Sequence, residues 1–94
     1  MTYSLRISED AEKEWNNLDA TIKVQFKKKL KERLEHPRVE PSRLSGMRDC
    51  YKIKLRSAGF RLVYRVYDEE IEVLVVTVGK RERNQVYKAA IKRL

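Results

Sequence analysis

The chain has little of what builds disulfide scaffolds, zinc clusters or histidine-based active sites. Cys50 is the single cysteine among 94 residues, so no disulfide can form within the chain and no thiolate cluster can bind zinc. We expect Cys50 to be a small, buried or half-buried residue. His36 is the single histidine and precedes Pro37 in a predicted loop, which makes it a poor candidate for a catalytic base.

Long apolar runs are also lacking. The longest, VLVVTV at Val73 to Val78, has the length of a strand and is far too short for a membrane-spanning helix. The first residues, MTYSLRISEDAEKEW, hold no long apolar stretch and become acidic early, unlike a secretory signal. We therefore expect a cytoplasmic protein without a membrane partner.

Acidic residues are the minority among the charged ones. The sequence has 22 lysines and arginines against 14 aspartates and glutamates, which gives a formal net charge of +8 and a pI near 9.8. Such an excess says more about partners than about the fold, and it favours a polyanion. The length suffices for one domain, residues 1–94, with one core of modest stability.

The apolar pattern predicts two helices after a short first strand. Thr2 to Ile7 alternates polar and apolar residues as a strand does. Ser8 can cap a helix from about Glu9 to Asn17, and Asp19 can cap a longer one. On the longer helix an apolar residue recurs every fourth position: Leu18, Ile22, Phe26, Leu30 and Leu34.

Lysines crowd the other faces of this second helix. They include Lys23, Lys27, Lys28 and Lys31. A charge run of this kind is either a solvated helix surface or an electrostatic footprint for nucleic acid. The sequence leaves both interpretations open, and the charge excess of the whole chain slightly favours the second.

Three strands and a closing helix are predicted after the two prolines, Pro37 and Pro41. The strand signals end in short turns and form an antiparallel meander; they cover Cys50 to Leu55, Phe60 to Tyr67 and Ile71 to Val78. A thin apolar stripe predicts a last helix within Glu82 to Leu94. The expected fold is α+β: a small single domain whose antiparallel sheet, first strand plus meander, packs against an N-terminal helical hairpin, with a C-terminal helix.

The predicted hairpin places cations where they repel one another. If Leu55 lies opposite Phe60, apolar residues face apolar residues and Lys54 faces Arg61. Like charges directly opposite on a sheet are destabilising, by up to about 1 kcal/mol for a pair. A bound anion would resolve the conflict, although Lys52 and Lys54 are equally compatible with a protected strand edge.

Further basic residues follow the last strand in the run KRERNQVY. The meander brings the end of this strand beside Arg61, so five residues can converge on one phosphate: Lys52, Lys54, Arg61, Arg81 and Tyr87. No carboxylates with metal-ligand spacing accompany them, so we expect neither a metal site nor a cofactor. Taken singly, each residue also has an ordinary structural interpretation, and Tyr87 is most simply a packing residue.

Long stretches of the chain resemble the RelE toxins of bacterial toxin–antitoxin pairs. They are KEWNNLD, KKKLKERLEHPRVE, RLSGMRDCYKIKLRSAGFRLVYRV and VTVGKRERNQVYKAAIKRL. The resemblance implies a toxin that enters the A site of the 70S ribosome and cuts messenger RNA there. The implied reaction is attack by a ribose 2′-hydroxyl on the adjacent phosphate, which leaves a 2′,3′-cyclic phosphate and a 5′-hydroxyl.

The resemblance also implies roles for single residues. Arg61 stabilises the charge on the reacting phosphate, and Arg81 assists the leaving oxygen. Lys52 and Lys54 bind phosphate, and neighbouring cations lower their pKa values. Tyr87 stacks on a base and orients the 2′-hydroxyl or acts as the base, so the general base is either a lysine or Tyr87.

Partners follow from the same resemblance. An acidic, apolar segment of a RelB-like antitoxin wraps the toxin and displaces the closing helix, and operator DNA is contacted through the antitoxin. Contacts with messenger RNA and 16S ribosomal RNA are expected from Lys23, Lys27, Lys28, Lys31, Arg65, Lys80 and Arg83. Two alternatives remain: a basic module that binds ribosomal RNA or DNA without cutting it, and a ParE-like toxin that poisons gyrase.

Overall fold

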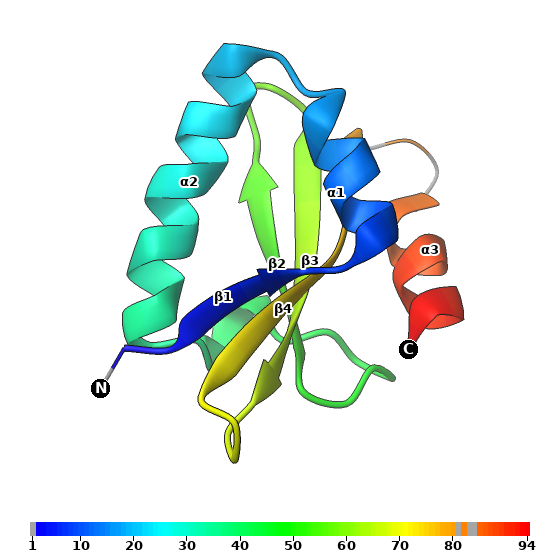
Figure 1. The fold of residues 1–94 in the computed structure, drawn as a ribbon. Coiled ribbons are helices and arrows are strands. Elements are labelled where there is room, and N and C mark those ends of the chain that lie inside the picture. Colours follow the sequence, from blue (N-terminus) through cyan, green and yellow to red (C-terminus); the bar gives the residue numbers. More distant parts are fainter. Residues whose placement is uncertain (1, 81, 83–84) are drawn as a thin grey trace.

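The protein folds into a four-stranded sheet with helices on both faces (Figure 1). The structure is a computed structural model and describes residues 2–80, 82 and 85–94. Its elements are β1 (Ser4–Ile7), α1 (Glu9–Asn16), α2 (Ala20–Glu35), the short 3-10 helix η1 (Glu40–Ser42), β2 (Cys50–Leu55), β3 (Phe60–Tyr67), β4 (Glu72–Lys80) and α3 (Gln85–Arg93). The predicted α+β class is confirmed.

The strands lie in the order β1-β4-β3-β2. The last three form the predicted antiparallel meander, and Leu55 pairs with Phe60 while Lys54 pairs with Arg61, as the alternation required. The sheet as a whole is mixed rather than antiparallel, because β1 runs parallel to β4. Two helices and two strands separate β1 from β4 in the chain, so no tight turn decides their relative direction.

Side-chain caps begin both N-terminal helices, as predicted. The Ser8 hydroxyl accepts a hydrogen bond from the Ala11 amide at 3.2 Å, and Asp19 Oδ1 accepts one from the Ile22 amide at 3.0 Å. The third strand of the meander begins one residue later than predicted. Ile71 has a φ of 53°, in the left-handed region, and therefore cannot continue a strand.

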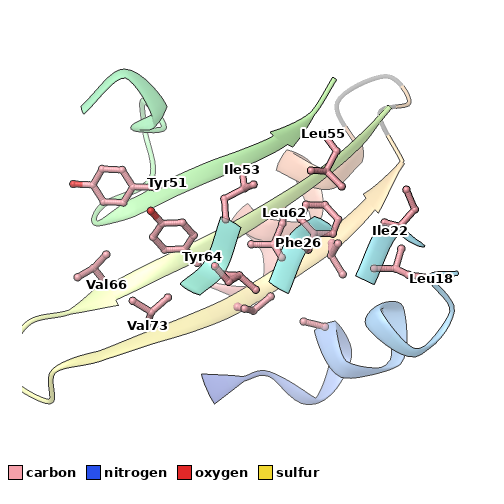
Figure 2. Close-up of a cluster of buried hydrophobic side chains, with 14 residues drawn as sticks. Leu18, Ile22, Phe26, Tyr51, Ile53, Leu55, Leu62, Tyr64, Val66 and Val73 are labelled. Atoms are coloured by element: carbon pink, nitrogen blue, oxygen red, sulfur yellow. The ribbon is translucent and has the colours of Figure 1, made fainter. Parts of the chain in front are cut away.

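The main core lies between the sheet and the helices α1 and α2 (Figure 2). Phe26 of α2 is fully buried there, and Tyr51 and Tyr64 stack with ring centroids 5.8 Å apart. Trp15, which the helical spacing places on the apolar face of α1, is only half-buried and lies against Phe26 with a centroid distance of 6.2 Å. Helix α2 therefore covers one face of the sheet.

A smaller core lies on the opposite face, under α3. Val86 and Ala90 of α3 pack there against Val63, Val76 and Cys50. Burial raises the pKa of the Cys50 thiol to about 11, and the predicted buried position of this cysteine is confirmed. Within the described ranges, no helix has the length and apolar character needed to cross a membrane.

Candidate functional site

Four cations gather on the sheet face that α3 covers and at the hairpin turn beside it. Because side chains alternate along a strand, burial of Ile53 in the main core turns Lys52 and Lys54 to the opposite face. Arg61 reaches the same face from β3, and Arg56 follows in the turn. We call Lys52, Lys54, Arg56 and Arg61 the cationic cluster.

Arg61 and Tyr87 meet although they are far apart in the sequence. Arg61 Nη1 donates a hydrogen bond to the Tyr87 hydroxyl at 3.0 Å, and the guanidinium carbon lies 5.2 Å from the centre of the Tyr87 ring. The buried side chains of Val86 and Ala90 hold α3, and with it Tyr87, against the sheet. The contact orients the planar guanidinium and leaves the rest of its donors for a ligand.

The cluster lacks charge compensation within the described part of the chain. None of the ion pairs formed by described residues involves Lys52, Lys54, Arg56 or Arg61. The positive charge of Lys52, and then desolvation, Arg61 and Arg56, lower the pKa of Lys54. The predicted repulsion between facing cations is thus present, and an anion would relieve it.

Arg56 is a member of the cluster that sequence reasoning missed. The predicted strand ends at Leu55 and the predicted turn is Ser57 to Gly59, so Arg56 belongs to neither. Its signal was nevertheless present, because Arg56 extends the series Lys52 and Lys54 by the same spacing of two residues. A cation that continues the every-second-residue spacing of a strand into the turn therefore indicates a further member of a cationic cluster.

The other predicted RNA-contacting residues lie in separate places. Lys23, Lys27, Lys28 and Lys31 lie on α2, which packs on the opposite face of the sheet from the cluster. Lys80 ends β4, pairs with Phe60 and is exposed near the cluster. Arg81 and Arg83 lie outside the described residues.

Arg65 lies farther along β3 on the same face as Arg61. Its side chain is half-buried, and its guanidinium carbon lies 5.1 Å from the centre of the Tyr67 ring. It borders a hollow with Lys92 and Leu94 rather than the hollow at the hairpin turn. The structure therefore does not bring Arg65 into the cationic cluster.

Acid–base groups of the usual kind are not gathered at the cluster. His36, in the irregular C-terminal cap of α2, is exposed. Among the described residues, no group of three or more His, Cys, Asp or Glu side chains is placed to hold a metal ion. The described side chains gathered at the cluster and beside it are those of lysine, arginine and tyrosine.

A partly buried hydrogen-bond network holds the backbone of β2 on the α2 side of the sheet. Arg33 Nη1 donates to the Lys52 carbonyl at 3.1 Å and to the Tyr64 hydroxyl at 2.9 Å. The Tyr64 hydroxyl in turn donates to the Pro37 carbonyl at 2.6 Å, and burial raises its pKa. The basic run on α2 gave no sign that Arg33, unlike its neighbours, points inward and fixes the backbone that carries Lys52.

An ion pair fastens the far end of α3. Arg93 Nη1 donates to Glu14 Oε1 at 2.7 Å and to the Val76 carbonyl at 3.0 Å. The same Glu14 oxygen accepts from the Thr77 hydroxyl at 3.1 Å and from the Val78 amide at 3.4 Å. Glu14 thus joins α1, the edge of β4 and α3, the helix that carries Tyr87.

Comparisons with known proteins agree on one family. Residues 5–85 match the family described as the ParE toxin of the type II toxin–antitoxin system parDE. The mRNA interferase toxin RelE of Escherichia coli strain K12 is 57% identical over 94 residues, which cover 100% of this chain and 99% of that protein. The mRNA interferase RelE of Shigella flexneri matches with the same identity and coverage.

Solved structures give the same result. A double mutant of E. coli toxin RelE in the free state matches with a TM-score of 0.93 and 55% identity, over 100% of this chain and 99% of that one. The toxin in the intact E. coli RelBE toxin–antitoxin complex matches with a TM-score of 0.83 and 58% identity, over 86% of this chain and 99% of that one.

Proposed function

The chain belongs to the RelE and ParE family of toxins from type II toxin–antitoxin systems, and we propose that it cleaves messenger RNA in the ribosomal A site. The cationic cluster, with Tyr87 hydrogen-bonded to Arg61, is the observation that carries this proposal. It offers uncompensated positive charge to a phosphate. The likeness to proteins named mRNA interferases supports RNA as the substrate.

The proposed reaction is an in-line displacement at phosphorus. The 2′-oxygen forms a bond to the phosphorus and gives up its proton, while the bond from phosphorus to the 5′-oxygen breaks and that oxygen gains a proton. The products are a 2′,3′-cyclic phosphate and a 5′-hydroxyl. Negative charge grows on the phosphate oxygens in the transition state, where the forked donors of Arg61 and the ammonium of Lys52 stabilise it.

Lys54 is the better candidate for the general base. Its lowered pKa increases the fraction of neutral amine, the form that accepts a proton. The Tyr87 oxygen already accepts a hydrogen bond from Arg61, which leaves its proton available for donation to the substrate. Arg81, outside the described residues, is proposed to assist the leaving oxygen, as in the family it resembles.

Such a set of groups depends on a well-oriented substrate. A 2′-hydroxyl attacks efficiently only when it is in line with the leaving oxygen, and correct orientation can contribute about 7 kcal/mol or more. We propose that the ribosome imposes this geometry. Because the α2 lysines lie on the opposite side of the sheet, they can contact 16S ribosomal RNA while the cluster faces the message.

A RelB-like antitoxin is the proposed inhibitor. Its acidic and apolar segment would displace α3, which buries Val86 and Ala90 but leaves Ile91 exposed, as is Leu94 directly after the helix. Displacement would separate Tyr87 from Arg61 and stop cleavage. With the antitoxin, the toxin is proposed to repress its own operon through DNA contacts made by the antitoxin.

The test is primer extension on a defined message in a reconstituted translation mixture. New 5′ ends inside A-site codons are expected with the wild-type protein, and Arg61→Gln is expected to lower the cleavage rate about 100-fold or more. Tyr87→Phe tests the hydroxyl, and Arg48→Gln is the matched control, because the Arg48 side chain is 89% exposed and does not belong to the cluster.

Each alternative has its own outcome in this experiment. Comparable cleavage of the same RNA without ribosomes would refute the ribosome dependence. Ribosome binding without new ends would indicate a basic module that only holds RNA. If neither occurs, inhibition of gyrase supercoiling would favour the ParE-like alternative.

A further inference from the structure

We propose that the hollow at the turn between β2 and β3 binds a second phosphate of the RNA strand, with Arg56 as its principal ligand. The inference rests on the proposed function, because it extends the substrate beyond the scissile phosphate. It assigns a role to a residue outside the five that the family resemblance singled out.

The hollow is about 230 Å³ in volume and sits at the end of the hairpin. Its lining residues are Lys54, Leu55, Arg56, Gly59, Phe60 and Arg61. Half of them are cations and none is acidic. A hollow of this composition is suited to a phosphate.

The shape of the turn keeps the hollow open. The Gly59 amide donates to the Leu55 carbonyl at 2.8 Å, and Gly59 has a φ of 71°, in the left-handed region. Apart from Gly59 and its two chain neighbours, no heavy atom lies within 4 Å of the position that a Cβ of Gly59 would take. The turn therefore adds no side chain at this position of the hollow, which Arg56 also lines.

The two arginines of the hollow are in different situations. Arg61 is held by the Tyr87 hydroxyl and ring, which fixes its fork beside the proposed reaction centre. Arg56 is exposed and enters no ion pair among the described residues, yet its charge is close enough to contribute to the lowered pKa of Lys54. Arg61 can thus serve the scissile phosphate while Arg56 binds the next one.

Two adjacent phosphate subsites select a nucleic acid strand over a single phosphate. Successive phosphates of RNA are joined through one ribose, so a strand that places one phosphate at Arg61 presents another nearby. Backbone contacts of this kind set the register of the strand and carry no base preference. Arg56 would then act chiefly on where the strand sits and how tightly it binds, and on the chemical step only through its small contribution to the lowered pKa of Lys54.

The first experiment compares two small ligands by NMR titration of the free protein. An adenosine 3′,5′-bisphosphate should bind about tenfold more tightly than adenosine 5′-monophosphate, as expected for one added charge-assisted contact. In Arg56→Gln this advantage should disappear, whereas Arg48→Gln should keep it. An equal advantage in wild type and Arg56→Gln would overturn the inference.

The second experiment measures cleavage on ribosomes. Arg56→Gln should raise the KM for the programmed ribosome about tenfold and make the salt dependence of kcat/KM less steep by about one counterion. The change in kcat should be much smaller than the change in KM, because Arg56 is the last of the contributors to the lowered pKa of Lys54. A loss confined to kcat would place Arg56 in the chemical step and overturn the subsite. If the wild-type protein cuts nothing, the proposed function fails, while the titration still decides whether the hollow binds two linked phosphates.

Discussion

Replacing Arg93 by Gln should loosen α3 and leave the sheet folded. Arg93 lies on the same side of α3 as Val86 and Ala90, the two buried residues of that helix. Its guanidinium is held by Glu14 Oε1 at 2.7 Å, by Glu14 Oε2 at 3.3 Å and by the Val76 carbonyl at 3.0 Å. These polar contacts attach the last turn of α3 to α1 and to β4.

The size of the effect follows from the exposure of the pair. A hydrogen bond to a charged group contributes about 1.5–3 kcal/mol when buried, and an exposed ion pair contributes about 1 kcal/mol or less. The side chains of Arg93 and Glu14 are 25% and 32% exposed, between these limits. We therefore expect the free energy of local opening of α3 to fall by about 1–2 kcal/mol, a factor of about 5–30 in the opening equilibrium.

Amide hydrogen exchange followed by NMR measures this opening directly. In Arg93→Gln, the amides of α3 should exchange about 5–30-fold faster, while those of β3 in the centre of the sheet stay unchanged. The matched control is Lys92→Gln, which removes the exposed neighbouring charge. Unchanged exchange in α3, or equal acceleration in Lys92→Gln, would refute the idea that this ion pair fastens the helix.

Three further predictions concern stability and reactivity. Tyr64→Phe should lower the free energy of unfolding by about 1–3 kcal/mol in urea titrations, because it leaves the buried Pro37 carbonyl without its donor. Hydrogen bonds from Arg38 and Tyr3 lower the pKa of Asp68 in the folded protein. The ionised Asp68 therefore stabilises the fold above its unfolded pKa of about 3.9, and this stabilisation is lost as the pH falls through the lower folded pKa. Asp68→Asn should flatten the dependence of Tm on pH in that range. The buried Cys50 thiol, whose pKa is raised to about 11, should react slowly with a thiol reagent in the folded protein and quickly in urea, and fast labelling without urea would contradict its burial.

Short-range sequence patterns predicted most of the secondary structure and the pairing of the hairpin strands. The register of β2 against β3 follows from matching apolar residues across a short turn, and it correctly paired Lys54 with Arg61. The caps of Ser8 and Asp19 were equally local, since each side chain bonds an amide three residues away. These features depend on neighbours in the chain, which a sequence displays directly.

Contacts between distant segments were harder to foresee. The parallel pairing of β1 with β4 depends on how two helices cross the sheet, and no short-range signal records it. Arg33 stands in a run of surface cations, yet its guanidinium hydrogen-bonds the hydroxyl of the buried Tyr64. The same residue type suits both places, so composition could not separate them.

The sequence by itself determined that the chain is a basic α+β domain, that cations face one another on a hairpin, and that long stretches of the chain resemble one toxin family. Only the tertiary structure decided that Tyr87 bonds Arg61, that Arg56 joins the cluster and that the α2 lysines lie on the other side of the sheet. The physical reason is the range of the interactions. Strand alternation and helix caps act over a few residues, whereas the site is made by the packing of α3 and β3, whose contacting residues stand 26 apart.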